Sequence, residues 1–454
     1  MANTLNMTSG KPMQLLFSFA LPLMFGNIFQ QLYTLVDIAI VGQGVGMDAL
    51  AALGCVDWLN WMLLGIAAGF TQGFGVRMSQ KYGQQDIEGL KRTLGNSAML
   101  TGIMAVICTA LAQLFLPTLL DLLQVPLGLR NYATVYSRIV MGGFPAVAFF
   151  NFASAVLRSV GDSKTPLMAM VVAAVTNIAL DLLTVFVFDW EVAGAAGATV
   201  FSQLLAGTIC AVRIYKTPEL HFSRRDLKLQ KNLALNLVKV GSPLAAKNLI
   251  IALGGIVVQS VVNGFKDVGF IAGFTSTNKL YGILEIAALS YGYAVTTYVG
   301  QNYGAMRIDR IKSGIKDATI LSLISSGIIA AIMFLLGRPI TMLFISQEDP
   351  AMALIAVDTA YTYLCTMSAA LPMLYTLYVF LSALQGMGNS VAALISGIVE
   401  LALRLGVAAL VAYTGYRSGI FAAEVAAWTG SAVFLVISYF INIRKIIKKN
   451  PLSV

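Results

Sequence analysis

One stretch places a carboxylate inside a run that otherwise suits lipid. In NIFQQLYTLVDIAIVGQ (residues 27–43), the polar side chains of Asn27, Gln30, Thr34 and Asp37 interrupt an apolar sequence. Each helical residue turns the chain by about 100°, so these four side chains fall within an arc of about 80° on one face. We expect a helix with one polar stripe facing protein or water and a remaining surface facing lipid.

A second stretch repeats this pattern further along the chain. In TNIALDLLTV, the side chains of Asn177, Asp181 and Thr184 lie within about 60° on one helical face. Two separate helices therefore each bring one aspartate with amide or hydroxyl companions. Both aspartates are therefore candidates for the same kind of chemistry.

The chemistry of such a site is ion binding. A charged side chain at the centre of a bilayer costs at least about 2.5–3.5 kcal/mol, so an aspartate kept there is a functional candidate by default. A carboxylate in a partly wet cavity can take up a proton or hold a sodium ion among oxygen ligands. Either use couples an ion gradient to movement, and the sequence leaves H⁺ and Na⁺ both open. We expect no other metal.

The elements that carry these residues are membrane helices. The chain has 454 residues, of which 58% are apolar and 11% charged, too few charges to cover a water-facing surface. The apolar runs are long and continuous, which favours helices over the alternating strands of a barrel. Twelve spans are predicted, at 13–41, 50–76, 94–117, 132–157, 165–189, 193–215, 236–263, 270–299, 314–337, 356–385, 391–413 and 419–443.

The sequence contains an internal repeat. A shift of 221 residues aligns MSQKYGQQDIEGLK with VGQNYGAMRIDRIK, and a shift of 227 aligns FPAVAFFNFASAVLRSVGDS with LPMLYTLYVFLSALQGMGNS. The predicted fold is therefore all-α and integral to the membrane, with two pseudo-symmetric six-helix lobes around a central cavity. The lobes span 1–215 and 236–454, and a basic loop at 216–235 joins them. Paired repeats of this kind are typical of transporters that alternate access to a polar site.

Basic residues set the predicted orientation. Most of the 30 lysines and arginines lie in the even-numbered connections and near the termini, whereas the opposite loops hold only Arg130, Lys266, Arg338 and Arg417. Positive charge is retained on the cytoplasmic side. We therefore expect a multi-pass protein of the cell membrane with both termini, the basic carboxyl-terminal tail included, in the cytoplasm. This topology accounts for the net charge of +9 without a nucleic-acid partner.

The sequence gives no support for an enzyme. His221 is the only histidine, the four cysteines are scattered, and the HExxH and GxSxG motifs are absent. We expect no cofactor, and a monomer that contacts membrane lipid and small organic substrates.

The sequence resembles a known family. The segments LPLMFGNIFQQLYTLVDIAIVG, ALAALG, GDSKTP, TNIALD and VGQNYGA are similar to those of multidrug and toxic compound extrusion (MATE) transporters of the prokaryotic DinF-like branch. The resemblance covers both lobes. It implies ion-coupled antiport of drugs and dyes, mostly cationic, by alternating access. It also implies an ion-coupling set and a set of cavity residues in the amino-terminal lobe: Asp37, Asn177, Asp181 and Thr199 for the ion, and Gln30, Tyr33, Tyr136 and Asn151 for the cavity wall.

The carboxyl-terminal lobe has charges of its own. NorM-like and eukaryotic members of the family use acidic residues in the seventh helix, but the segment from Pro243 to Asn263 has none. Glu285 lies in an apolar run, and Glu400 precedes Arg404 by one helical turn, the favourable order for an ion pair. We expect Glu400 and Arg404 either to form a structural ion pair or to contribute to gating. For Glu285 a lysine partner and a coupling role both stay open.

Two other functions are alternatives to efflux. A flippase for lipid-linked oligosaccharides, from the same superfamily, is the main alternative, but its cavity would need cationic groups to hold a pyrophosphate. A proton-channel subunit of a respiratory complex would need Lys/Glu pairs in broken helices and no six-helix duplication. The two aspartates and the repeat favour the efflux transporter.

Overall fold

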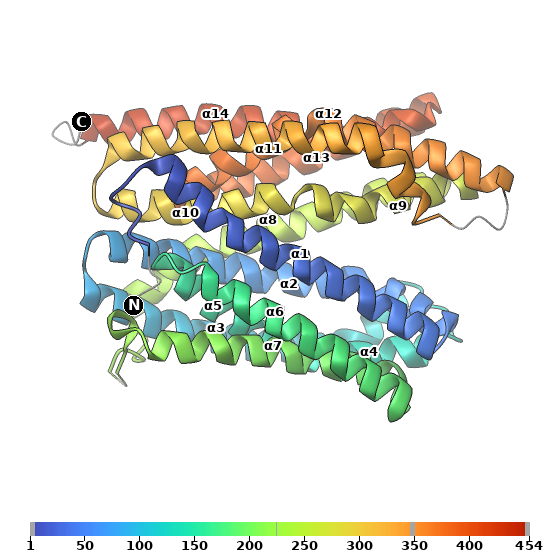
Figure 1. Cartoon of the computed structure of the whole chain (residues 1–454), viewed down its shortest axis with the longest axis horizontal. Coiled ribbons are helices and arrows are strands. Elements are labelled where there is room, and N and C mark those ends of the chain that lie inside the picture. Colours follow the sequence, from blue (N-terminus) through green and yellow to red (C-terminus); the bar gives the residue numbers. More distant parts are fainter. Residues whose placement is uncertain (1–4, 224, 346–349, 450–454) are drawn as a thin grey trace. The chain divides into compact units, whose positions relative to one another are not determined.

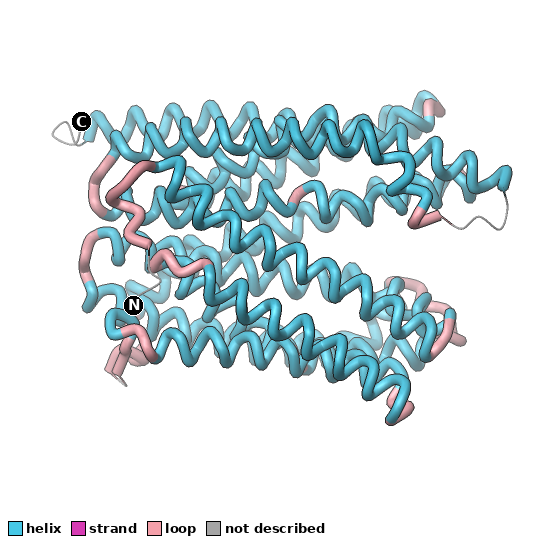
Figure 2. The backbone as a smooth tube through the Cα atoms, in the orientation of Figure 1, coloured by secondary structure: helices cyan, strands magenta, loops and turns pink. Residues whose placement is uncertain are grey.

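The computed structural model describes residues 5–223, 225–345 and 350–449, and within these ranges the chain forms helices and no strand (Figures 1 and 2). The first half contains α1 (Pro12–Gly44), α2 (Met47–Gly83), α3 (Ile87–Leu122), α4 (Arg130–Gly142), α5 (Phe144–Ser159), α6 (Lys164–Asp181), the π-helix η1 (Leu182–Val187), α7 (Glu191–Tyr215) and the short 3₁₀ turn η2 (Pro218–Leu220). The second half contains α8 (Lys231–Gly264), α9 (Val268–Leu284), α10 (Ile286–Gly304), α11 (Ile308–Met342), α12 (Pro350–Gly386), α13 (Ser390–Thr414), the 3₁₀ turn η3 (Arg417–Phe421) and α14 (Ala422–Lys449).

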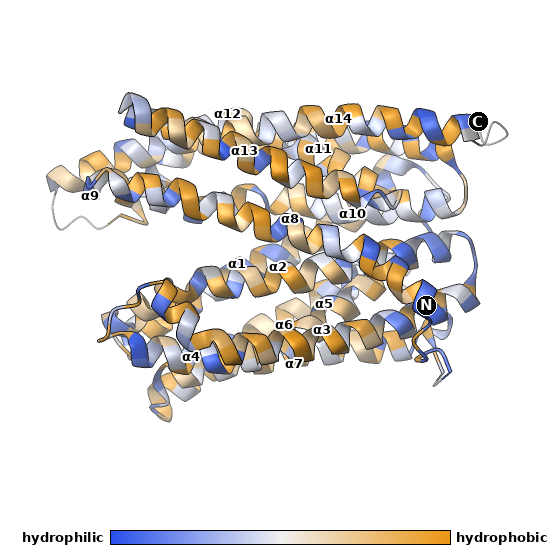
Figure 3. Ribbon diagram, turned by 180° about the vertical axis from the view of Figure 1, so that it is seen from behind, coloured by the Kyte–Doolittle hydropathy of each residue, from blue (hydrophilic) through white to orange (hydrophobic). Residues whose placement is uncertain are grey.

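Most of these helices are suited to a bilayer. Among the described residues, nine helices are long and apolar enough to cross a membrane, and two bent pairs raise the number to eleven. The eighth predicted span, 270–299, coincides with α9 and α10, which meet at Glu285. Hydrophobic residues run along the helices and hydrophilic ones gather at helix ends and loops (Figure 3). The prediction of an all-helical integral membrane protein is confirmed, and each predicted span coincides with one helix or two consecutive ones.

The chain packs into two compact units. The first comprises Leu21–Asn248 and the residues before Thr8, and the second comprises Thr8–Ala20 and the residues from Leu249 onward. Both divisions fall inside helices, α1 and α8, so each of these two helices contributes to both units. The lobe bounds 1–215 and 236–454 were predicted from the repeat, and they stay a prediction.

Equivalent turns in the two units have the same geometry. Gly161 and Gly388 both adopt left-handed backbone conformations, with φ of +88° and +84°. The residue after each glycine then caps the next helix. Asp162 accepts a hydrogen bond from the backbone N–H of Thr165, and Asn389 accepts one from that of Ala392. In both units the glycine therefore ends one helix with a turn, and the next residue caps the helix that follows.

Replacing Gly161 with alanine is expected to destabilise the protein more than the same change at Gly415. Both glycines have positive φ, and a side chain in that conformation costs roughly 1–2 kcal/mol. At Gly161 a Cβ would also lie 2.1 Å from the carbonyl oxygen of Leu5, whereas at Gly415 none of the described atoms comes within 4 Å. Thermal unfolding of both variants in detergent measures the difference. Equal losses would show that the contact with Leu5 has no energetic weight.

Candidate functional site

The first site residue, Asp37, is directed into the amino-terminal unit. Its side chain is 8% exposed, whereas Leu35 and Ile38 beside it are 40% and 37% exposed. Helix α1 therefore presents an apolar surface to lipid and its aspartate to protein, as the spacing predicts. Thr34 departs from the predicted stripe, because it is exposed and its hydroxyl donates to the carbonyl of Gln30 in its own helix.

Two glycines set the position of α1 along α6. A Cβ at Gly26 would lie 3.7 Å from Cα of Leu167, and one at Gly44 would lie 2.5 Å from Cγ1 of Val185, which follows α6 in η1. From the first contact to the second, the residue numbers rise in both segments, so the two helices run parallel. Asp37 then lies level with the last turn of α6, which carries the second aspartate.

That turn holds the most deeply buried polar groups of the site. Asn177 is 1% exposed and Asp181 is fully buried. Asp181 is the last residue of α6, and the π-helix η1 begins directly after it. Such π segments are rare and frequently occur at functional sites. The sequence pattern predicted the side chains but gave no sign of this change in helix type.

The carboxyl groups of Asp37 and Asp181 lie near enough to interact with each other. Within the described chain, several buried polar atoms of this pair and of α6 and α7 have no hydrogen-bond partner of normal geometry. These atoms are Oδ1 of Asp37, both side-chain oxygens of Asp181, Oδ1 and Nδ2 of Asn177, and the hydroxyl oxygens of Thr199 and Ser202. An unsatisfied buried polar group costs about 1–3 kcal/mol, so a concentration of them indicates a site for a ligand.

Helix α7 brings the third group of polar side chains. Thr199, Ser202 and Gln203 share one helical face because they are spaced by three and four residues. Nε2 of Gln203 donates to the hydroxyl of Tyr33 across 3.3 Å, which links α7 to α1. Ser202 and Gln203 are polar residues that the two aspartate stripes did not predict. The signal that could have found them is the polar spacing in TVFSQLL, which resembles that of the two aspartate stripes.

The remaining predicted wall residues occupy different positions. The hydroxyl of Tyr136 on α4 lies within electrostatic reach of Asp37, Asp181 and Tyr33, so it belongs to the site. Asn151 on α5 donates its amide back to the carbonyl of Val147 in its own helix. Gln30 is half-buried on α1, two turns before Asp37. The described contacts therefore bring Tyr33 and Tyr136 to the carboxyl pair but do not join Gln30 or Asn151 to it.

Apolar clusters pack against two tyrosines of the site. Tyr33 packs against one cluster that includes Phe74, Phe150 and Phe152. Tyr136 packs against another, formed by Ile40, Val41, Ala49, Leu53, Val185, Val192 and Ala195. Apolar surroundings lower the local dielectric, so electrostatic interactions at the site are stronger than in water.

The residues present fit a small cation bound through oxygen. Two carboxylates, the amide oxygen of Asn177 and the hydroxyl of Thr199 are ligand types suited to a proton or a sodium ion. Across the described ranges, no group of three or more histidine, cysteine and acidic residues has metal-binding geometry. The unpartnered oxygens of Asp181 and Asn177 are the observation that supports this fit.

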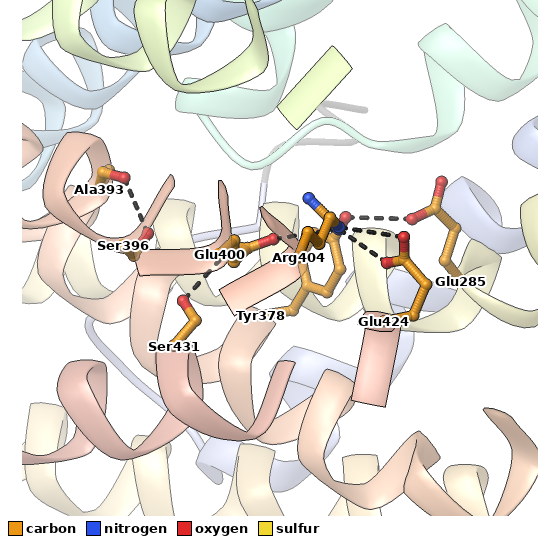
Figure 4. Close-up of polar contacts among 8 residues, drawn as sticks. All are labelled: Glu285, Tyr378, Ala393, Ser396, Glu400, Arg404, Glu424 and Ser431. Carbon is orange, nitrogen blue, oxygen red and sulfur yellow. Dashed lines mark hydrogen bonds and ion pairs between the residues drawn. The ribbon is translucent and has the colours of Figure 1, made fainter. Parts of the chain in front are cut away.

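The predicted charges of the carboxyl-terminal unit form a separate buried cluster (Figure 4). Arg404 on α13 makes two hydrogen bonds to Glu424 on α14, Nε to Oε1 at 3.0 Å and Nη2 to Oε2 at 2.7 Å. Its separation from Glu400 is longer, 3.6 Å. Arg404 thus lies between two carboxylates, and its main partner is Glu424, which the sequence analysis did not identify.

The other acidic groups of this cluster have hydroxyl partners. Ser431 donates to Oε1 of Glu400 across 3.3 Å, and the hydroxyl of Tyr378 donates to Oε2 of Glu285 across 3.2 Å. Glu285 occupies the junction of α9 and α10. These charge-assisted bonds tie α13 to α14 through Arg404 and Glu400, and tie α12 to the junction of α9 and α10 through Tyr378.

The family model MatE matches residues 22–183 and 243–410, which is most of the chain. The chain belongs to the MATE family. The two matched segments of this MATE protein begin at Pro22 and Pro243, so their spacing of 221 residues equals the shift of the internal repeat. The predicted family is confirmed.

Other MATE and related proteins are similar over most of their length. The chain is 28% identical over 339 residues to the probable multidrug resistance protein YoeA of Bacillus subtilis, covering 73% of each chain. It is 25% identical over 416 residues to the FAD transporter of Shewanella oneidensis, covering 90% of each. A solved MOP superfamily transporter from Pyrococcus furiosus has a TM-score of 0.91 at 22% identity, over 97% of this chain and 98% of that one. The structural likeness shows the fold, and the family is one of multidrug efflux transporters.

Proposed function

We propose that this MATE protein is an antiporter that uses the inward movement of H⁺ or Na⁺ to export organic, mostly cationic compounds by alternating access. The observation that supports the proposal is the pair of buried carboxyls, Asp37 and Asp181, surrounded by polar atoms without partners. We also assign the protein to the DinF-like branch, because the candidate ion site lies in the amino-terminal unit.

The coupling ion acts on the charge of this pair. Two ionised carboxylates at close range repel each other, and a cation that binds between them removes the repulsion. Helix α1 carries Asp37 and touches η1 through Gly44 and Val185, so a change at the carboxyl pair can shift α1 against η1. A ligand changes the balance between two states only by binding them unequally. Antiport therefore requires the ion and the drug to prefer opposite states.

The charge of the site also indicates the substrate class. Asp37 and Asp181 are acidic, and the side chains that the described contacts join to them are neutral. This favours cationic over anionic compounds. The relative from Shewanella oneidensis is named for FAD transport, so FAD is the natural anionic comparison for an export assay.

The topology of the proposal follows the distribution of basic residues. The protein lies in the cell membrane with both termini in the cytoplasm. It acts as a monomer, requires no cofactor, and contacts lipid and small organic substrates.

Transport in proteoliposomes tests the coupled activity. Purified protein is reconstituted, a fluorescent cationic dye is loaded, and a proton or a sodium gradient is imposed separately. Dye movement driven by one of the gradients supports antiport and identifies the ion. Movement that neither gradient changes would contradict the proposal, and FAD serves as the anionic comparison.

Ion and drug are expected to weaken each other's binding by the same factor. This reciprocity is a thermodynamic requirement when two ligands prefer opposite states, with typical factors of about 5–150. Equilibrium binding of the dye to detergent-solubilised protein is measured over a pH series at fixed sodium and a sodium series at fixed pH. A dye affinity that ignores both ions would exclude coupled antiport and favour the flippase alternative.

A further inference from the structure

Gln203 is a buried polar residue beside an apolar cluster. Its side chain is 8% exposed, and Ala206, one turn later on α7, belongs to the apolar cluster against which Tyr33 packs. An amide in such surroundings costs several kcal/mol unless it is hydrogen-bonded. Packing alone would favour leucine or methionine here, so the amide is retained for its hydrogen bond.

The bond that Gln203 makes fixes the role of its partner. The amide nitrogen donates, so the hydroxyl oxygen of Tyr33 accepts at 3.3 Å. A phenol has one proton of its own to donate. Tyr33 lies one turn before Asp37 on the same face of α1, so with its oxygen held by Gln203 it can turn that proton toward Asp37 and Asp181.

We propose that Gln203 is a positioning residue for the ion site. It holds the hydroxyl of Tyr33 so that its proton faces the Asp37–Asp181 pair and stabilises the two carboxylates when the coupling cation has left. The proposal rests on the proposed function, and it adds α7 to the elements that control cation release.

The consequence for transport is specific. A hydrogen bond to an ionised carboxylate stabilises the cation-free site, so its loss makes the cation bind more tightly and leave more slowly. The variant Gln203→Met, which is close in size, should therefore lower the cation concentration for half-maximal dye displacement by about tenfold. It should also lower the maximal rate of dye efflux. A purely structural defect would not tighten cation binding.

A double-mutant cycle tests whether Gln203 acts through Tyr33. Gln203→Met, Tyr33→Phe and the double variant are compared in the full-length protein, by cation titration of dye binding in detergent and by dye efflux in liposomes. Each single change and the double change should give the same shift, because they remove one shared interaction. Gln203→Leu provides a second variant if the methionine protein does not fold.

A matched control comes from the same helix. Thr208 is exposed on the opposite face of α7, and its hydroxyl donates to the carbonyl of Leu204. Thr208→Val should leave both measurements unchanged.

The outcomes separate this inference from the proposed function. The positioning role would be overturned if the shift in cation binding of the double variant were the product of the two single shifts. Weaker cation binding in Gln203→Met would overturn it as well. A normal Gln203→Met protein beside an inactive Asp37→Asn protein would overturn the inference and leave the proposed function standing. Normal transport by Asp37→Asn would overturn the proposed function itself.

Discussion

Replacing Asp37 with asparagine is expected to abolish ion-driven efflux of a cationic dye while the protein still folds. Asparagine keeps the shape of the side chain but cannot bind a proton or carry the charge that attracts sodium. Asp37 is 8% exposed and interacts with Asp181. It is the one acidic residue of α1, so no other side chain of this helix can replace its carboxyl group. Dye efflux from proteoliposomes under an imposed gradient should fall to the rate measured without a gradient.

The controls for this result lie in the same unit. Asp181→Asn should reduce efflux strongly, because it removes the other carboxyl of the pair. Asp48 is exposed in the first turn of α2, and Asp48→Asn should transport at the normal rate. Transport by Asp37→Asn at the rate of the unmodified protein, under the same gradient, would remove the basis of the proposed mechanism.

The largest expected effect on stability is at Arg404. The change Arg404→Met leaves Glu400 and Glu424 buried without their cation, and the side chains of Arg404 and Glu424 are only 4% and 15% exposed. Removing one partner of a buried ion pair costs about 3–5 kcal/mol. The variant should therefore show a much lower midpoint of thermal unfolding in detergent.

An exposed ion pair in the same unit provides the comparison. Arg338 and Asp358 lie 2.7 Å apart, but their side chains are 47% and 57% exposed. Arg338→Met should cost less than about 1 kcal/mol, because water and salt weaken an exposed pair. If the two methionine variants unfold at the same temperature, burial does not control the strength of the Arg404 cluster.

Local spacing was sufficient to predict the helices and the two aspartate stripes. Asp37, Asn177 and Asp181 follow from the period of a helix and the cost of charge in a membrane. The contact of Tyr33 with Gln203 joins residues 170 positions apart, and that of Arg404 with Glu424 crosses the turn between two helices. Such partners depend on how helices pack, which a single sequence pattern does not contain.

The ends of the compact units illustrate the same limit. The repeat and the basic loop at 216–235 suggested a division between helices, because loops are where composition changes. The compact units end within α1 and α8, and the lobe bounds stay a prediction. No proline or glycine lies at Glu285 itself or within the π-helix after Asp181, so the sequence pattern marked neither feature.

The division within α1 and α8 bears on how a duplicated chain of this kind can arise. The unit that contains Leu249 and the residues after it also includes Thr8–Ala20, and the other unit includes the first part of α8. Neither half of the sequence alone therefore carries every residue of one unit. A chain of half this length would complete such a unit only if a second copy supplied the first part of one helix. Fusion of the two copies would then have preserved an existing exchange.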